Sequence, residues 1–230
     1  MALAIVTGGD RGIGRAISEK LAQEGYDIVI AARNKRAIAS QVKRIEGLGA
    51  KAWGFVCDLT EKDQIKKLAK DVTDQAGVPD ILINNAGVAT GKNFVHDTDE
   101  EIRAMVDVNL LGLMLFTKAF LTDMIERKSG IIVNISSGAG KTGFPGLAVY
   151  CATKFGVIGF TESLAKEVEK RGVRVYAICP GSTETDMWHS LYPGESADFV
   201  PQDVAAEVIE LIKNASKVKP GSAIDVRKRV

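Results

Sequence analysis

Short apolar runs alternate along the chain with longer segments in which apolar residues recur at helical spacing. The runs that predict β-strands cover residues 2–6, 27–31, 51–56, 80–89, 130–136, 173–179 and 222–226. The segments that predict helices cover residues 15–25, 34–48, 99–125, 150–170 and 201–215, and a further helix follows residue 60. Because a helical segment separates each strand from the next, the pattern predicts an α/β fold with a parallel sheet.

The predicted fold is one domain over residues 1–230, a doubly wound parallel sheet of about seven strands with helices on both faces. In such open sheets, ligands bind beyond the carboxyl ends of the strands, where the strand order reverses. Turn and cap residues support the element boundaries. Gly25 ends the first helix, Thr60 with Asp63 predicts a helix cap, and Thr98 with Glu101 predicts a capping box.

Composition excludes several classes of function. The chain has 230 residues, 46% of them apolar, and a formal net charge of +1, which gives no electrostatic reason to expect nucleic acid or an anionic membrane as a partner. No apolar run approaches ~20 residues, so no spanning helix is expected, and the N-terminus leads straight into a strand rather than a signal peptide. The three cysteines and two histidines are widely spaced, which predicts reduced thiols, no metal site and a cytoplasmic protein.

The stretch from Asn134 to Gly156 carries most of the candidate chemistry. Tyr150 and Lys154 are four residues apart and therefore share one helix face. A nearby cation favours an ionised phenol, so Lys154 is expected to lower the pKa of Tyr150 and to let it exchange a proton with an alcohol. Ser137, at the end of a strand, can donate a hydrogen bond to the same substrate oxygen. Taken alone, the Tyr–Lys pair is also consistent with chance on an amphipathic helix.

A glycine-rich turn joins the first predicted strand to the first predicted helix. Gly8, Gly12 and Gly14 would let the backbone turn sharply and approach a pyrophosphate. The helix N-terminus that follows them offers unpaired N–H groups and the positive end of the helix dipole. The alternative interpretation is an ordinary strand–helix turn.

The residues after the second strand indicate which nucleotide is expected. An acidic side chain at that place would hold a ribose 2′-hydroxyl, but this chain has Ala31, Ala32 and then Arg33. Arg11, inside the glycine turn, adds a second guanidinium, and an arginine can pair with two oxygens of a 2′-phosphate at once. The pattern therefore predicts NADP(H) over NAD(H), unless both arginines are solvated surface charges.

A serine followed thirteen residues later by Tyr-x-x-x-Lys resembles the active site of the short-chain dehydrogenase/reductase family. The TGxxxGxG spacing of the glycine turn resembles the variant found in that family, and the likeness extends over nearly the whole chain. It implies a Rossmann-type fold and an NADP(H)-preferring enzyme that resembles the 3-oxoacyl-acyl-carrier-protein reductase and carbonyl reductase members.

The resemblance implies a role for each matching residue. The catalytic group would be Asn109, Ser137, Tyr150 and Lys154, with Asn109 binding a water that touches Lys154 at the end of a proton relay from Tyr150. Asn109 as a plain helix-packing residue and Asp58 as a local cap are the alternatives. The cofactor would be bound by Tyr150 and Lys154 together with Gly8, Arg11, Gly12, Ile13, Gly14, Arg33, Asp58, Leu59, Asn85, Ala86, Gly87, Pro180, Gly181, Thr183 and Thr185.

The family keeps a mobile substrate lid where this chain has a short segment near residues 186–200. The substrate pocket would combine Ser137 and Tyr150 with Phe144 and the lid residues Met187, Trp188 and Tyr192, and Leu147 and Leu191 would add apolar wall. A solvated position is expected for His189. In the family, the helices that carry Asn109 and Tyr150 pack against a second subunit, which implies a homo-oligomer, a tetramer or a dimer.

The sequence therefore predicts an NADP(H)-dependent oxidoreductase that reversibly transfers hydride between nicotinamide and a small-molecule carbonyl or secondary alcohol. The apolar lid favours an apolar ketone or aldehyde, and 3-oxoacyl thioesters, quinones, diketones and steroids all fit. One alternative is a non-catalytic NADP(H)-binding sensor of the same fold. A sugar epimerase or dehydratase would require a longer chain with a larger substrate domain.

Overall fold

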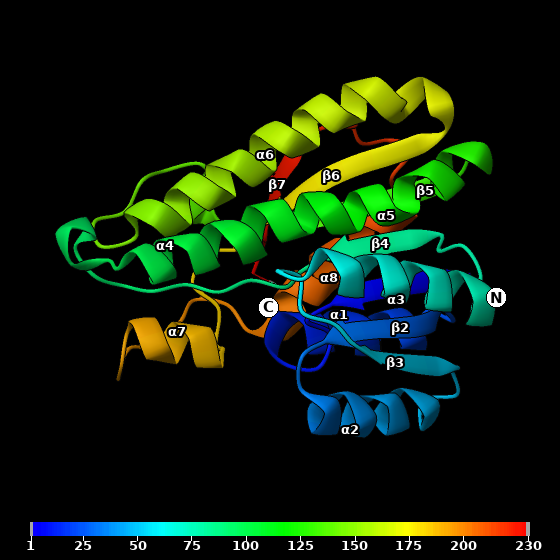
Figure 1. Ribbon diagram of the computed structural model, residues 1–230, viewed down its shortest axis with the longest axis horizontal. Coiled ribbons are helices and arrows are strands. Elements are labelled where there is room, and N and C mark those ends of the chain that lie inside the picture. The colour runs from blue at the N-terminus through cyan, green and yellow to red at the C-terminus, as the bar shows by residue number, and fades with distance from the viewer. Residues whose placement is uncertain (1, 229–230) are drawn as a thin grey trace.

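The computed structural model describes residues 2–228, and within them seven parallel strands form one sheet. Their order is β3-β2-β1-β4-β5-β6-β7 (Figure 1). The strands are β1 Leu3–Thr7, β2 Asp27–Ala32, β3 Ala52–Val56, β4 Ile81–Asn84, β5 Gly130–Ile135, β6 Val173–Cys179 and β7 Ala223–Asp225. Strand order runs outward in both directions from the β1–β4 pair, so the predicted doubly wound α/β sheet is confirmed.

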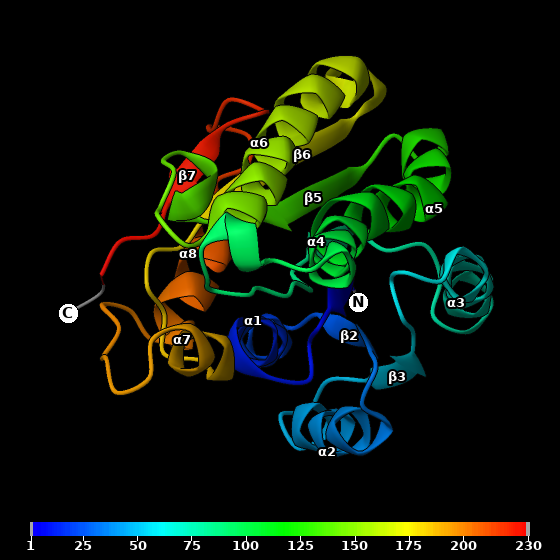
Figure 2. The same ribbon diagram turned by 60° about the vertical axis from the view of Figure 1, so that its left-hand side comes forward.

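Helices cover both faces of the sheet (Figure 2). One face packs against α1 (Gly12–Gln23), α2 (Lys35–Glu46) and α8 (Pro201–Lys213), and the other packs against α3 (Lys62–Gln75), α5 (Leu113–Glu126) and α6 (Ala148–Val168). Because side chains alternate along a strand, β1 serves both layers. Ala4 and Val6 join the first core cluster, while Leu3 and Ile5 join the second.

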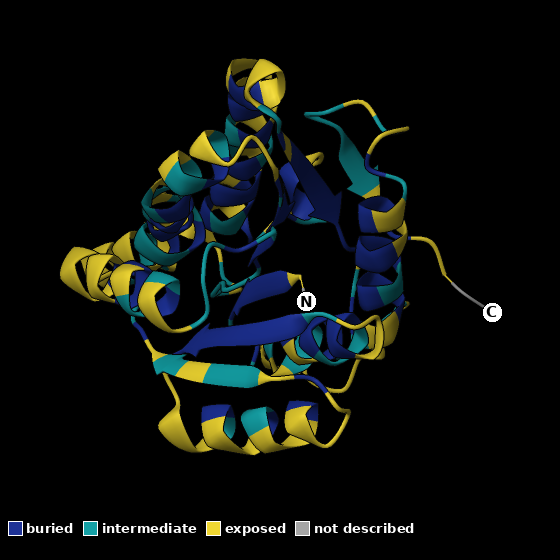
Figure 3. Ribbon diagram, turned by 90° about the vertical axis from the view of Figure 1, so that its right-hand side faces the viewer, coloured by how far each residue is buried: buried dark blue, intermediate teal, exposed yellow. Residues whose placement is uncertain are grey.

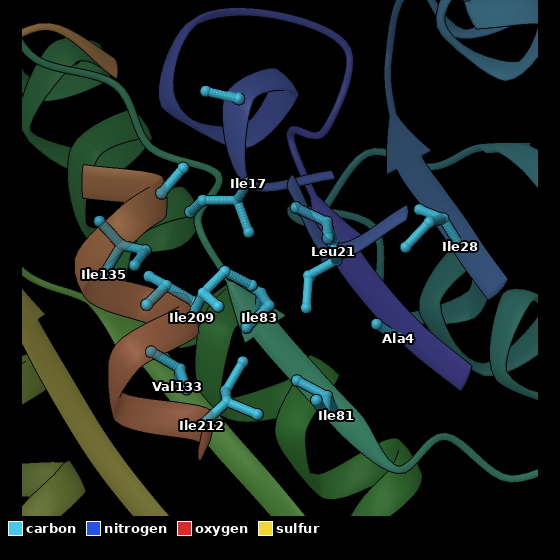
Figure 4. Packing of buried hydrophobic residues seen from close by; sticks show 14 of the residues in the cluster. Ala4, Ile17, Leu21, Ile28, Ile81, Ile83, Val133, Ile135, Ile209 and Ile212 are labelled. Carbon is cyan, nitrogen blue, oxygen red and sulfur yellow. The ribbon is translucent and has the colours of Figure 1, made fainter. Parts of the chain in front are cut away.

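The two cores are made mostly of aliphatic side chains. Ile17 and Leu21 of α1 approach Ile209 and Ile212 of α8 over the strands (Figure 4). Strands β1, β2 and β4 are buried throughout, whereas the edge strands β3 and β7 are partly exposed (Figure 3). Each fully buried side chain of this size contributes about 1.5–3 kcal/mol relative to an exposed one. The rigid sheet places the loops at its carboxyl edge.

Some predicted boundaries differ from the structure. The first helix begins at Gly12 inside the glycine turn rather than at Arg15, and β4 ends at Asn84, well before residue 89. The predicted cap at Thr60 is wrong, because α3 begins at Lys62 after Glu61, and Thr60 instead donates through its N–H and hydroxyl to Asp58 Oδ1. The capping box of Thr98 and Glu101 is confirmed at the start of α4 (Asp99–Val106).

A continuous helix runs from Asp99 to Glu126 through α4, a π-helical segment at Asp107–Gly112, and α5. By length and composition it could cross a membrane, although a buried core helix meets the same test. Its α5 half packs against β4 and β5, with Phe116, Phe120 and Met124 fully buried, whereas its α4 half packs against α6. Helix α5 is thus a core helix that packs on the sheet beside α3.

Candidate active site

A cleft of about 800 Å³ opens at the carboxyl edge of the sheet. Its wall includes the residue that follows each of six strands, namely Gly8, Arg33, Cys57, Asn85, Ser136 and Pro180. Of the predicted site residues, Gly14 and Asn109 alone stand outside the lining, and both lie directly behind it. The topology therefore gathers segments that are far apart in the sequence around one space.

The glycine turn has the close packing that its composition predicted. Gly8 and Gly12 have φ values of +62° and +50°, in the left-handed region that favours glycine. A Cβ on Gly14 would lie 2.1 Å from the Gly8 carbonyl oxygen, so only glycine fits beneath the turn. Asn85 fastens the turn to β4, donating through Nδ2 to the Thr7 carbonyl at 2.9 Å and to the Gly8 carbonyl at 3.3 Å.

Two arginines flank the turn on the cleft surface. Arg11 and Arg33 have side chains 65% and 63% exposed, and each stands 3.8–3.9 Å from one carboxylate, Asp186 for Arg11 and Asp58 for Arg33. Pairs this exposed contribute little to stability, so both guanidinium groups can turn to an anionic ligand. Asp58 also caps its own loop through Thr60, so the local-cap interpretation of Asp58 holds, and both Asp58 and Leu59 line the cleft.

Three small or polar residues after β4 form the floor between the nucleotide end and the catalytic end. Asn85 and Ala86 both donate their backbone N–H to the Thr7 hydroxyl, at 2.9 and 3.0 Å. A Cβ on Gly87 would lie 3.3 Å from Asn109 Oδ1 and 3.7 Å from Lys154 Nζ. Gly87 therefore keeps open the space in front of Lys154.

Ser137, Tyr150 and Lys154 converge as predicted. Helix α6 carries Tyr150 and Lys154 on one face, with Lys154 Nζ 5.6 Å from the Tyr150 ring centroid. Ser137 caps the short 3₁₀ turn Gly138–Gly140 by accepting from Ala139 N–H at 3.1 Å, and it hydrogen-bonds with the Tyr150 phenol. The Lys154 amine is buried and donates to the Ile135 carbonyl at 2.8 Å.

The electrostatics differ from the sequence prediction at one point. Burial raises the pKa of Tyr150 to about 12, and the hydrogen bond with Ser137 offsets only part of that rise. Burial also lowers the pKa of Lys154 to about 8. The structure does not show the expected lowering of the Tyr150 pKa: desolvation sets an upward net shift, and the Lys154 amine is directed at the Ile135 carbonyl.

Asn109 occupies the π-helical segment and is fully buried. Its side chain accepts from Val88 N–H at 2.8 Å and donates to the Val88 carbonyl at 2.8 Å and to Thr153 Oγ1 at 3.2 Å. These bonds fix the loop after Gly87, so the packing interpretation of Asn109 is satisfied. The helix around Asn109 is π-helical rather than α-helical.

Two supporting residues were missed from the sequence. Ser136 donates to the Lys154 carbonyl at 2.9 Å, which fastens α6 to the end of β5. Lys141 reaches β7, donating to the Ala223 carbonyl at 3.0 Å and to Asp225 at 2.6 Å. The role of Ser136 was indicated by the serine doublet Ser136–Ser137. The contact of Lys141 depends on the order of the strands, which no local sequence pattern reveals.

The segment after β6 forms the far wall and leads into the lid. Pro180 accepts from Gly138 N–H at 2.8 Å, which fastens the Ser137 turn to this segment. The hydroxyl of Thr183 donates to the Gly181 carbonyl, and that of Thr185 donates to the Thr183 carbonyl and caps the lid helix α7 (Asp186–Leu191). Pro180, Gly181, Thr183 and Thr185 all face the cleft.

Hydrogen bonds fix the two ends of the lid segment, and an aromatic contact packs the helix within it. Glu184 N–H donates to the Phe199 carbonyl at 2.9 Å, and Phe199 N–H donates to the Ser182 carbonyl at 3.0 Å. The Ser182 hydroxyl donates to Asp198 Oδ2 at 2.7 Å. Trp188 and Tyr192 stack with centroids 4.4 Å apart, and both line the cleft with Met187 and Phe144. His189 is half exposed and lies 2.9 Å from Glu184, as expected for a lid histidine.

Comparisons with known proteins agree with this site. A family model described as short chain dehydrogenase matches residues 2–196. The 3-oxoacyl-(acyl-carrier-protein) reductase of Thermotoga maritima is 34% identical over 97% of this chain and 95% of its own. The protein of the same name from Haemophilus influenzae is 36% identical over 99% of this chain and 88% of its own.

Solved structures extend the likeness to three dimensions. A variant of actinorhodin polyketide ketoreductase with NADPH matches with a TM-score of 0.91 and 33% identity, covering 98% of this chain and 95% of the other. Levodione reductase matches with a TM-score of 0.91 and 25% identity, covering 97% and 95%. This chain therefore belongs to the short-chain dehydrogenase family and is an oxidoreductase enzyme.

Proposed function

We propose that the protein reduces the carbonyl group of small apolar substrates in the cytoplasm with NADP(H) as its cofactor, reversibly forming a secondary alcohol. The observation that carries the proposal is the position of Tyr150. Its phenol lies in the cleft, hydrogen-bonded with Ser137 and one helical turn from Lys154. A phenol so placed can give a proton to a carbonyl oxygen in the same cleft.

Residues of the chain fit the nucleotide. The glycine turn and the N-terminus of α1 offer N–H groups and a close backbone to a pyrophosphate. Arg11 and Arg33 offer guanidinium groups to a 2′-phosphate, with no carboxylate at the end of β2 to hold a 2′-hydroxyl. Lys154 would hold the ribose, and Thr183 and Thr185 the carboxamide, while Asn109 would support Lys154. When bound, the nicotinamide supplies the hydride.

The chain's own acid–base groups favour reduction. With its pKa raised to about 12, Tyr150 is protonated at neutral pH and ready to act as a general acid, a contribution of about 10²–10⁴-fold. Ser137 adds a hydrogen bond to the same oxygen. Tyr150 is therefore in the protonation state that carbonyl reduction requires, whereas alcohol oxidation would need the phenolate. The net direction of the reaction depends on the concentrations of substrate, product and nucleotide.

The shape and polarity of the cleft favour an apolar ketone. Phe144, Met187, Trp188 and Tyr192 line its substrate end, and such walls accept aliphatic, aromatic or acyl groups rather than charged sugars. The names of the relatives point the same way, since they describe a 3-oxoacyl reductase, a polyketide ketoreductase and levodione reductase.

A Tyr150→Phe variant tests the enzymatic proposal. We expect carbonyl reduction to fall by about 10²-fold or more, while the Kd for NADPH, measured by nucleotide fluorescence, stays close to that of the wild type. Tyr26→Phe, at a tyrosine outside the cleft, is the control and should keep full activity. Unchanged turnover in Tyr150→Phe would reject the role of Tyr150. A wild type that binds NADPH but reduces no ketone or aldehyde of a broad panel would favour the non-catalytic sensor instead.

The cofactor preference is tested by Arg33→Ser. Loss of the guanidinium should raise the Kd for NADPH about ten-fold, which corresponds to about 1.4 kcal/mol, and should leave the Kd for NADH nearly unchanged. Arg44→Ser removes an arginine of similar exposure that pairs with Glu19 outside the cleft, and it should change neither value. Equal losses for NADPH and NADH in Arg33→Ser would contradict recognition of the 2′-phosphate.

A further inference from the structure

A second, smaller cavity adjoins the substrate end of the cleft. It is an open hollow of about 380 Å³, bordered by residues 91–93, by residues 145–147 and by Leu191 and Tyr192 of the lid. Leu147, Leu191 and Tyr192 line both this side pocket and the main cleft, so these three side chains form the partition between the two spaces. Its volume alone lies in the range of about 300–1,000 Å³ that is usual for ligand pockets.

Of the three side chains in the partition, Leu147 and Tyr192 are held by packing, and Leu191 has more freedom to move. Leu147 is buried in a small cluster with Ala139 and Cys151, and Tyr192 is held by its stack on Trp188. Leu191 is only partly buried, and its side chain packs on the cluster next to Tyr150. A Cβ on Gly91 would lie 2.9 Å from Leu191 Cδ2, so Leu191 rests directly on the bare backbone of Gly91.

The side pocket suits an uncharged group. Lys92 is the one charged residue among those that line it, all of which lie in the described part of the chain, and its amine is ion-paired with Glu101. The rest of the wall is Leu, Tyr, Pro, Asn and glycine backbone. A carboxylate or phosphate would meet an amine that already pairs with Glu101, so the lining favours an uncharged substituent over an anion.

We propose that Leu191, held in place by Gly91, determines which ketones the enzyme accepts by closing the side pocket to a bulky substituent on the carbonyl carbon. The inference rests on the proposed carbonyl reduction. With Leu191 in place, a small substituent fits beside Tyr150 and a large one is excluded. Removal of the Leu191 side chain joins the two cavities and admits an aryl or branched group.

Two substitutions with opposite expected effects test this role. The probes are ethyl 3-oxobutanoate and ethyl 3-oxo-3-phenylpropanoate, which differ only by methyl against phenyl on the reacting carbon. Leu191→Ala should raise the kcat/KM ratio of the phenyl to the methyl ester about ten-fold or more. Gly91→Ala, which the backbone allows because the φ of Gly91 is not positive, should push Leu191 toward Tyr150 and lower that ratio several-fold.

The double variant distinguishes displacement of Leu191 from a general loss of packing around the cleft. Once Leu191 is truncated, the added methyl of Gly91→Ala has no side chain to push, so Gly91→Ala/Leu191→Ala should match Leu191→Ala alone. Leu48→Ala, an exposed leucine at the end of α2, is the control and should leave the ratio unchanged. Additive effects, or changes of the same sign in both single variants, would overturn the proposal.

A binding measurement keeps the two proposals apart. Calorimetry of both esters in the Tyr150→Phe background requires no turnover, and the ratio of their Kd values should shift in the same order across the Leu191 and Gly91 variants. Ester binding that follows this order without any reduction by the wild-type protein would reject the carbonyl reductase and keep the pocket assignment. Reduction with unshifted ratios would reject the role of Leu191 alone.

Discussion

Lys154 is the residue at which function and stability oppose each other. The residue is 4% exposed, and its amine is hydrogen-bonded to the Ile135 carbonyl, with no carboxylate of the described chain paired to it. Burial lowers its pKa from 10.5 to about 8. The unfolded chain therefore binds this proton more tightly than the native protein does, and holding a cation at this place costs folding free energy at neutral pH.

The sign of the pH dependence follows from that shift. Between about pH 8 and 10.5, the native Lys154 is largely neutral while the unfolded one is still charged, so its contribution to the free energy of unfolding rises with pH. Lys154→Met lacks this rise. We expect the free energy of unfolding of the wild type to gain about 1–3 kcal/mol relative to Lys154→Met between pH 7 and 10, measured by urea denaturation.

Lys118→Met, at an exposed lysine, serves as the control and should track the wild type over the same range. Tyr150 does not disturb the comparison, because its raised pKa affects stability only above about pH 10 and is common to both proteins. A gap between wild type and Lys154→Met that stays constant with pH would contradict the buried-cation account.

For single residues, the sequence predicted which side chains converge in the site, but it did not predict the direction of their pKa shifts. The spacing of Ser137, Tyr150 and Lys154 placed them together correctly, because helix geometry fixes positions four residues apart. The direction of the Tyr150 shift depends on how deeply the phenol is buried and where the amine points. Those quantities come from the packing of β5 against α6, which lies outside any local pattern.

Two glycines of helix α6 differ in how closely another segment packs against them. A Cβ on Gly156 would lie 3.0–3.1 Å from the methyl groups of Leu110 in the π-helical segment, whereas a Cβ on Gly159 would meet nothing within 4 Å. The first glycine allows two helices to approach closely, and the second has no such contact within the described chain. The sequence shows a glycine at both positions and could not tell them apart.

Alanine at the two positions should therefore act in opposite directions. Gly159→Ala should stabilise the protein by about 0.5–1 kcal/mol, because alanine loses less backbone entropy in a helix. Gly156→Ala should destabilise it by about 1–2 kcal/mol through crowding of Leu110. Thermal unfolding of both variants measures the difference. Stabilisation by Gly156→Ala would show that α6 and the π-helical segment tolerate a wider separation than the structure gives.

Element boundaries were predicted best where caps are local. The Thr98–Glu101 box was correct because both partners lie within one turn. Thr60 was misassigned because Asp58, two residues earlier, bonds with its hydroxyl and N–H instead. A sequence offers both pairings, and the end of β3 decides between them.

Three of the exposed apolar side chains lie on the long helix and on α6. Val106, Leu111 and Phe155 are 38–46% exposed on the long helix and on α6, and these helices are apolar over much of their circumference. The homo-oligomer expected from the family resemblance would bury these side chains. We propose this helical face as the subunit contact, which a single chain leaves open to solvent.

Phe155→Glu tests that contact. A charge placed there should convert the assembly to a smaller species or to monomers, measured as molar mass by light scattering after size exclusion. Val56→Glu, at a comparably exposed position on the edge strand β3, should leave the molar mass unchanged. A wild type that is already monomeric at micromolar concentration would contradict the proposed assembly.

The doubly wound parallel sheet and the location of the cleft at its carboxyl edge were predictable at this scale, because strand–helix alternation leaves few topologies. The side pocket was not, since it depends on Gly91, Leu147 and Leu191, which are distant in sequence and meet only when the lid folds back. Loops of this kind often determine specificity, whereas the candidate catalytic side chains lie on α6 and on the turn after β5.

The six-residue π-helical turn at Asp107–Gly112 also limits how this protein can be re-engineered. An α-helix advances about 100° per residue, so the length of this turn sets the angular phase between α4, which faces α6, and α5, which faces the sheet. Deletion of one residue here would rotate α5 relative to α4 by about 100°. Phe116 and Phe120 would then no longer face the core in which they are buried. The segment should accept changes of residue type at its outer positions far better than any change of length.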